Sequence, residues 1–158
     1  MSNAGAIEFM RRAIQLGVDN VRNGGGPFAA LVVRGGEVVA EGANRVTASN
    51  DPTAHAEIVA IRAACRALDT FQLTGCDLYT TCEPCPMCLG AIYWARPDRI
   101  YFAAGRDDAA LAGFDDAFIY EEIARPFGER RIPMTQVLAD ESMAVLRAWQ
   151  QAEDKVRY

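Results

Sequence analysis

Hydrophobic and polar positions alternate with helical spacing over residues 6–22, where apolar side chains recur every three or four residues with charges between them. This spacing predicts an amphipathic helix, ended by the glycines and proline of residues 24–27. Two apolar runs, residues 28–33 and 38–43, flank a short polar turn and predict a β-hairpin. The apolar positions of the helix are Ile7, Met10, Ile14, Val18 and Val21.

From residue 54 onward the pattern alternates between helix and strand. Residues 54–68 are apolar on nearly all sides, which predicts a buried helix. A strand at 78–81, a helix at 86–95 and a strand at 99–103 follow. This order predicts parallel strands joined by helical crossovers, and the hairpin makes the sheet mixed.

Beyond residue 105 the periodicity weakens, and it predicts helices at 117–124 and 141–154 with a short strand at 135–138. The sum is a mixed, mostly parallel five-stranded sheet with helices. A length of 158 residues fits one domain, residues 1–158.

Composition excludes several classes of protein. No apolar run reaches the ~20 residues that cross a bilayer, and no secretion signal opens the chain. The formal net charge is −5, and the arginines are scattered in nothing longer than pairs, which argues against a nucleic-acid partner. Five cysteines, an odd number without an export signal, indicate a reducing cytoplasm.

Candidate metal ligands occur in two short segments, His55-Ala56-Glu57 and Pro84-Cys85-Pro86-Met87-Cys88. Cys85 and Cys88 are three apart at a helix start, so they share one face, and the helix N-terminus favours thiolates. With the imidazole of His55 they give three protein ligands. The fourth position of a tetrahedral zinc ion is then open for water, as in catalytic sites.

His55 and Glu57 are two apart, and they would point in different directions in the middle of a helix. They can converge only near a helix end, which Asp51 or Thr53 is expected to cap, with Pro52 in the first turn. Glu57 is the expected acid–base residue, which moves the proton of the attacking water to the departing amine.

Each element of this pattern has an ordinary structural explanation. An isolated histidine, a first-turn glutamate and a CxxC pair occur in folds without catalysis, and the pair could also be redox-active. Together, however, H-x-E followed by P-C-x-x-C is the signature of zinc-dependent deaminases. Cys82 is assigned to packing, and Cys65 and Cys76 to buried apolar positions.

The sequence resembles the cytidine deaminase-like superfamily of zinc enzymes, and within it most closely the bacterial guanine deaminases. The resemblance extends along nearly the whole chain. It rests on residues 25–28, 49–57, 82–97 and 112–120, together with the terminal Tyr158.

The resemblance implies a three-layer α/β/α fold, one Zn²⁺ per subunit, and a homodimer whose C-terminal segment is exchanged between subunits. It implies that guanine is converted to xanthine and ammonia. The substrate-binding residues that it implies are Asn44, Asp116, Phe28, Ala56 and Trp94, together with Tyr158 of the partner subunit.

Four other functions are left open by the residues themselves. A tRNA adenosine deaminase and a guanosine deaminase share the zinc motif. A zinc-binding module without turnover and a redox protein using Cys82, Cys85 and Cys88 belong to other classes. Considered without the resemblance, Asn44 is an ordinary turn residue, and Asp116 could simply cap the helix at 117.

Overall fold

The computed structural model describes residues 3–158, which form two compact units. The first unit runs to Asp116, and the second spans Ala117–Tyr158. Among the described residues, no helix is both long and apolar enough to cross a membrane.

The first unit is built on a four-stranded sheet in the order β2-β1-β3-β4. The strands β1 (Ala29–Arg34) and β2 (Glu37–Ala43) form the predicted antiparallel hairpin. β1 also pairs antiparallel with β3 (Cys76–Cys82), and β3 pairs in parallel with β4 (Arg99–Ala104). The mixed sheet and the parallel crossover are therefore as predicted, and β2, β3 and β4 run in the same direction.

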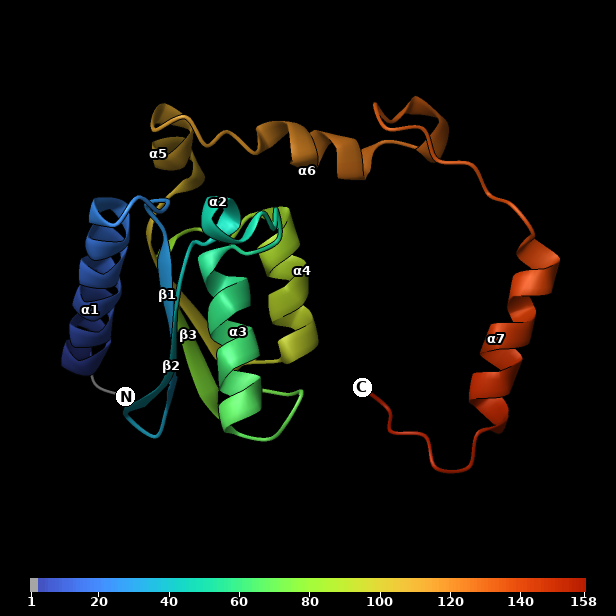
Figure 1. Cartoon of the computed structure of the whole chain (residues 1–158), viewed down its shortest axis with the longest axis horizontal. Coiled ribbons are helices and arrows are strands. Elements are labelled where there is room, and N and C mark those ends of the chain that lie inside the picture. The colour runs from blue at the N-terminus through green and yellow to red at the C-terminus, as the bar shows by residue number, and fades with distance from the viewer. Residues whose placement is uncertain (1–2) are drawn as a thin grey trace. The chain divides into compact units, whose positions relative to one another are not determined.

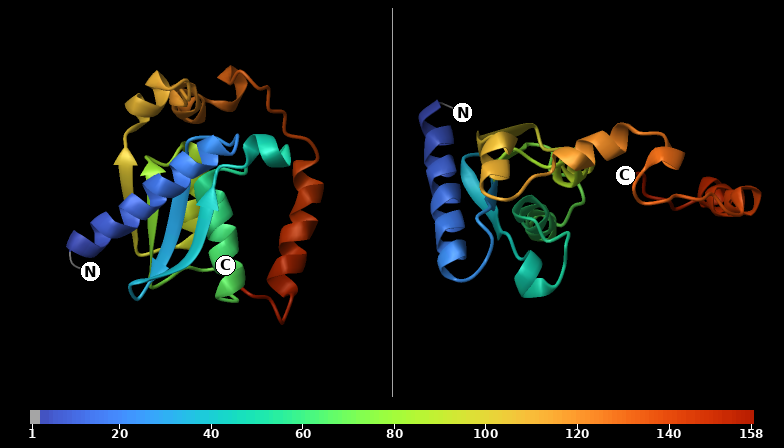
Figure 2. Two further views of the ribbon diagram at one scale, coloured as in Figure 1. Left: turned by 60° about the vertical axis from the view of Figure 1, so that its left-hand side comes forward. Right: turned by 90° about the horizontal axis from the view of Figure 1, so that it is seen from above.

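Helices cover both faces of this sheet and give the three layers that were expected (Figure 1). The helix α1 (Asn3–Arg22) packs on β1 and β3 from one side. The helices α3 (Ala56–Ala67) and α4 (Pro86–Ala95) lie side by side on the other face, as the view from above in Figure 2 also shows. A separate apolar core fills each of the two interfaces between helices and sheet.

The face that α1 packs on the sheet differs from the stripe that its spacing suggested. Four positions of the predicted stripe are between 42% and 49% exposed: Ile7, Ile14, Val18 and Val21. The residues that pack on the sheet lie on a neighbouring stripe: Ala6, Phe9, Met10, Ala13 and Leu16. The helix itself is confirmed, and only Met10 belongs to both stripes.

The start of α3 corrects one prediction and explains the position of its polar residues. The helix begins at Ala56, and His55 is its N-cap residue. Asp51 caps no helix: its Oδ1 accepts hydrogen bonds from the backbone N–H of Thr53 at 2.8 Å and from its hydroxyl at 2.7 Å. These bonds close a local turn that contains Pro52, so the chain enters α3 later than expected. The start of α4 is as predicted, with Pro86 in its first turn after the N-cap residue Cys85.

The second unit contains α6 (Ala117–Ala124), a short 3₁₀ helix (Phe127–Glu129) and α7 (Ala139–Gln151). Both predicted helices are present. The fifth strand, predicted at 135–138, was wrong: Leu138 has a left-handed φ of 52°, and Val137 is 74% exposed. No strand among the described residues pairs with this segment, and a strand needs a neighbour to satisfy its backbone groups.

Two short helices of the first unit were not predicted: α2 (Val46–Ser49) and α5 (Arg106–Leu111). Both are shorter than two full turns, so neither presents a periodic apolar pattern. The organisation as one domain with an exchanged C-terminal segment stays a prediction.

Candidate metal centre and active site

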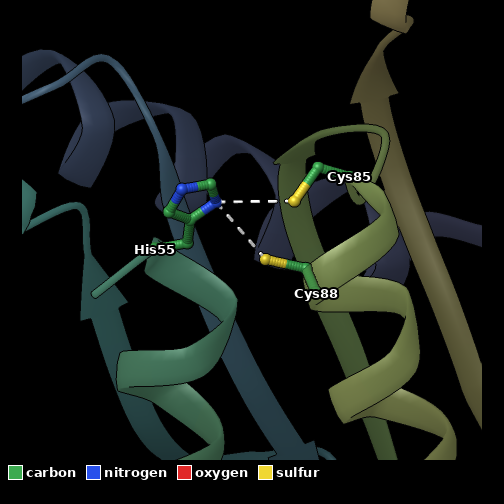
Figure 3. Close-up of side chains that lie close together, drawn as sticks. All are labelled: His55, Cys85 and Cys88. Carbon is green, nitrogen blue, oxygen red and sulfur yellow. Dashed lines mark hydrogen bonds between the residues drawn. The ribbon is translucent and has the colours of Figure 1, made fainter. Parts of the chain in front are cut away.

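The side chains of His55, Cys85 and Cys88 meet where α3 and α4 begin (Figure 3). The Nδ1 atom of His55 lies 3.6 Å from the sulfur of Cys85 and 3.5 Å from that of Cys88. His55 and Cys85 are the N-cap residues of their helices, both with extended backbone, so their side chains reach beyond the helix ends. Cys88 follows in the first turn of α4 and points to the same place.

These distances fit a tetrahedral zinc ion. With Zn–S about 2.3 Å and Zn–N about 2.0–2.1 Å, tetrahedral angles separate a sulfur from a nitrogen by roughly 3.6 Å. The two S···N distances agree with this value, and all three ligand atoms lie within 4.8 Å of one another. Two thiols and one imidazole are also a donor set that zinc binds commonly.

The thiols of Cys85 and Cys88 shift each other's pKa values in opposite directions. A hydrogen bond from the Cys88 thiol, helped by His55, lowers the pKa of Cys85 to about 4. The same bond, together with burial, raises the pKa of Cys88. The hydrogen bond to the Cys85 thiolate raises the pKa of His55. A metal cation bound between the two sulfur atoms would stabilise both as thiolates.

Glu57 lies beside this group at the second position of α3. Its side chain is only 6% exposed, and its Oε2 lies 3.5 Å from the sulfur of Cys88. Burial raises the pKa of the Glu57 carboxyl group. The carboxylate is thus held next to the candidate metal ligands while still lining an open pocket.

Cys82 lies outside the group of candidate ligands, as predicted, although it also lines the pocket. Its thiol is buried at the end of β3, and its sulfur lies 3.8 Å from the carbonyl oxygen of Gly105. Burial raises the pKa of Cys82 to about 11. Cys76 is also fully buried, and Cys65 packs against the same apolar core.

A pocket of about 440 Å³ lies next to the candidate metal ligands, within the first unit. His55, Glu57 and Cys85 line it, and so do three of the residues expected to bind substrate: Phe28, Asn44 and Asp116. The ring of Phe28 contacts that of Phe114 edge-on, with centroids 4.9 Å apart. Burial raises the pKa of Asp116. The structure thus brings six sequence-predicted residues to one cavity.

The other three expected substrate-binding residues do not line this pocket. Ala56 is fully buried in the core between α3 and the sheet. Trp94 is 64% exposed near the end of α4. Tyr158 belongs to the second unit, where its ring lies edge-on to Trp149 with centroids 6.5 Å apart. Roles for these residues stay predictions.

Several residues of the pocket wall were given no role from the sequence, although Glu83, Phe114 and Asp115 lie in segments that carry the resemblance. The wall residues without a predicted role are Val46, Thr47, Glu83, Arg106, Ala109, Phe114 and Asp115. A signal for two of them existed: Glu83 directly follows β3, and Arg106 lies two residues after the end of β4. Ligands of open α/β sheets bind beyond the carboxyl ends of the strands. The backbone N–H of Arg106 donates to Glu83 Oε2 at 3.2 Å, which joins these two ends of the wall.

Comparison with known proteins agrees with this geometry. Residues 5–104 match the family described as the cytidine and deoxycytidylate deaminase zinc-binding region. The chain belongs to this family. The match ends with β4, so it covers the candidate metal ligands and the first unit up to that strand.

Within the deaminase family, relatives differ in how much of the chain they share. Guanine deaminase of Bacillus subtilis is 55% identical over 151 residues, which cover 95% of this chain and 97% of that protein. An X-ray structure of guanine deaminase from Bacillus subtilis has a TM-score of 0.95 at 53% identity and covers 100% of this chain and 99% of that one. The tRNA-specific adenosine deaminase of the same organism is 33% identical, with 89% and 86% covered. The predicted family and fold are confirmed.

Proposed function

We propose that this protein is a zinc-dependent guanine deaminase, which hydrolyses guanine to xanthine and ammonia in purine catabolism or salvage. The observation that carries the proposal is the meeting of His55, Cys85 and Cys88 beside the buried carboxylate of Glu57. His55, Cys85 and Glu57 line one pocket. The relationship to a guanine deaminase over nearly the whole of both chains supports guanine as the substrate.

His55, Cys85 and Cys88 would hold one Zn²⁺ per subunit. Zinc bound there would supply acidity, since it lowers the pKa of a bound water from 15.7 to about 7. Two thiolates would offset the charge of the metal, so the loaded site would be a weaker Lewis acid than one made of three histidines. Proton transfer by Glu57 is therefore expected to carry a larger share of the catalysis.

Glu57 moves the two protons of the attacking water in turn. Water adds to the ring carbon that bears the exocyclic amine and forms a C–O bond. Glu57 accepts a proton from the water and delivers it to the ring nitrogen. It then takes the remaining proton of the added hydroxyl group and delivers it to the amine, so the C–N bond breaks, ammonia leaves and the hydroxyl becomes the carbonyl of the product. Such acid–base help typically contributes ~10²–10⁴-fold.

Recognition of the base is assigned to Asn44 and Asp116 on the wall of the pocket, with Phe28 stacking on the purine ring. An amide can both donate and accept, whereas a carboxylate accepts N–H groups. A base without the matching edge leaves these polar groups unpaired, which discriminates strongly.

The nearest alternative is tRNA adenosine deamination, because a tRNA-specific relative matches most of the chain. That enzyme must bind a polyanion, and this chain has a formal net charge of −5. A guanosine deaminase is the second alternative, since the pocket volume admits a base or a nucleoside.

One assay separates these functions. Ammonia release is measured on zinc-loaded protein with guanine, guanosine, adenine, cytosine and an adenosine-bearing RNA stem-loop. Guanine turnover far above the rest is expected. Turnover of the RNA without turnover of guanine, falling steeply with added salt, would show the tRNA activity instead.

The protein is further proposed to act as a homodimer whose C-terminal segment reaches the partner's active site. The second unit exposes many large apolar side chains, which is typical of a surface that a partner covers. They include Phe118, Ile123, Val145, Leu146 and Trp149. Deleting Tyr158 should weaken guanine turnover without loss of zinc, and unchanged kinetics would remove this residue from the site.

The protein is also proposed to be located in the reducing cytoplasm, which its free cysteines fit.

A further inference from the structure

Asn20, a partly buried residue near the end of α1, joins two segments of the pocket wall although it does not line the pocket itself. Its side-chain Nδ2 donates to the carbonyl oxygen of Gly26 at 2.8 Å and to that of Asn44 at 3.0 Å. Both N–H bonds of the amide are thus used. Its backbone carbonyl accepts from the N–H of Gly25 at 2.8 Å. One residue of α1 therefore holds the glycine loop and the chain after β2 together.

The glycines of the loop leave room for this arrangement. A Cβ atom on Gly25 would lie 2.4 Å from Asn20 Nδ2, closer than real Cβ contacts allow. A Cβ atom on Gly26 would lie 2.9 Å from Asn44 Oδ1. Both asparagine amides therefore lie against a backbone without side chains. A glycine loop has wide conformational freedom, so it needs such bonds to keep one shape.

Asn44 is fixed by its neighbours at three polar atoms. Its backbone N–H donates to the carbonyl oxygen of Phe28 at 3.0 Å, and its backbone carbonyl accepts from Asn20. Its side-chain Oδ1 accepts from the N–H of Val46 at 3.3 Å. Since the oxygen of the amide is engaged, its Nδ2 is the end that can donate to a ligand in the pocket. The orientation of this donor depends on the backbone that Asn20 holds.

We infer that Asn20 is a positioning residue that sets purine recognition through Asn44 and the Gly24–Gly26 loop. This inference rests on the proposed function. Asn20 is not expected to touch the substrate or move a proton. Its loss should allow the wall to shift, so substrate binding weakens while the candidate metal ligands and Glu57 stay in place.

The test compares Asn20→Ala with Asn23→Ala, a matched change at the same helix end. Asn23 is exposed, and its Nδ2 donates to the backbone oxygen of Asp19 at 2.9 Å, a bond within α1 and its end. For Asn20→Ala, kcat/KM for guanine should fall about tenfold or more, mostly through a higher KM, with unchanged zinc content. Asn23→Ala should retain the kinetics of the unchanged chain.

A double-mutant cycle with Asn44→Ala separates positioning from a general structural effect. If Asn20 acts through Asn44, the double variant should lose little more than Asn44→Ala alone. Full addition of the two losses, or unchanged guanine kinetics in Asn20→Ala, would overturn the inference. If Asn20→Ala does not fold, Asn20→Ser, which keeps one hydrogen-bond donor, takes its place. Its KM for guanine should rise above that of the unchanged chain, by less than the rise expected for Asn20→Ala. Guanine kinetics equal to those of the unchanged chain would overturn the role. No guanine turnover by the unchanged chain would instead overturn the proposed function, and this role with it.

Discussion

A single added methyl group beneath α3 should disturb the candidate active site from a distance. Gly42 of β2 is buried where the first turn of α3 crosses the strand. A Cβ atom there would lie 2.3 Å from the carbonyl oxygen of Ala56 and 2.4 Å from the nitrogen of Ala60. Both contacts are with backbone, so no side-chain rotation relieves them. In Gly42→Ala the strand and the helix must move apart by roughly 1 Å, and a displacement of that size can reduce catalysis by about 10²-fold.

The movement affects the reaction because His55 and Glu57 lie at that end of α3, whereas Cys85 and Cys88 lie on α4. Gly42→Ala should therefore separate the imidazole from the thiols and weaken zinc binding. Overpacking of this kind costs about 1–3 kcal/mol of folding free energy. The melting temperature should fall by about 2–4 °C for each kcal/mol in a chain of this size.

Three measurements check this reasoning: thermal unfolding, zinc content after dialysis, and kcat/KM for guanine. Gly90→Ala is the matched control, because Gly90 lies in α4 and a Cβ atom there meets nothing within 4 Å. That change should stabilise the helix by about 0.5–1 kcal/mol and leave turnover intact. A Gly42→Ala protein as stable, as rich in zinc and as active as the unchanged chain would refute the argument.

Three further predictions concern single side chains. Glu57→Gln should keep its zinc but lose ~10²–10⁴-fold in kcat, and near-normal turnover in the zinc-loaded variant would remove Glu57 from proton transfer. Cys85→Ser should lose most of its zinc while Cys82→Ser keeps it; metal analysis showing equal loss in both would contradict the ligand set. Hydrogen bonds from Thr53 lower the pKa of Asp51, so its stabilising effect is present at neutral pH and is lost as the pH falls through that lowered value. Denaturant unfolding should accordingly show Asp51→Asn less stable than the unchanged chain at pH 7 and equally stable in acid, and a constant difference across pH would disprove the linkage.

The first unit could be predicted from the sequence because its signals are local and agree with one another. The hairpin follows from two apolar runs around Gly35-Gly36, where both glycines have positive φ. The start of α4 follows from Pro86 after Cys85. The candidate metal group was recognisable because His55 and the CxxC pair each sit at a helix start, and two such starts on one face of a sheet can meet.

The features that could not be predicted depend on partners distant in sequence. Apolar spacing did not distinguish the packed stripe of α1 from the exposed one, because that choice depends on where Tyr79 and its neighbours lie. The segment 135–138 has the composition of a strand but no neighbouring strand among the described residues. The bonds from Asn20 to Gly26 and Asn44 join residues up to 24 positions apart, and no local pattern marks them.

Metal removal and restoration test the central claim most directly. The protein is stripped with a chelator, and zinc is returned in known amounts while xanthine formation from guanine is followed. Turnover should be absent from the stripped protein, rise in proportion to added zinc, and reach its plateau at one zinc per chain. Guanine turnover without metal, a plateau at another ratio, or no xanthine at any zinc content would contradict a zinc-dependent guanine deaminase built on His55, Cys85, Cys88 and Glu57.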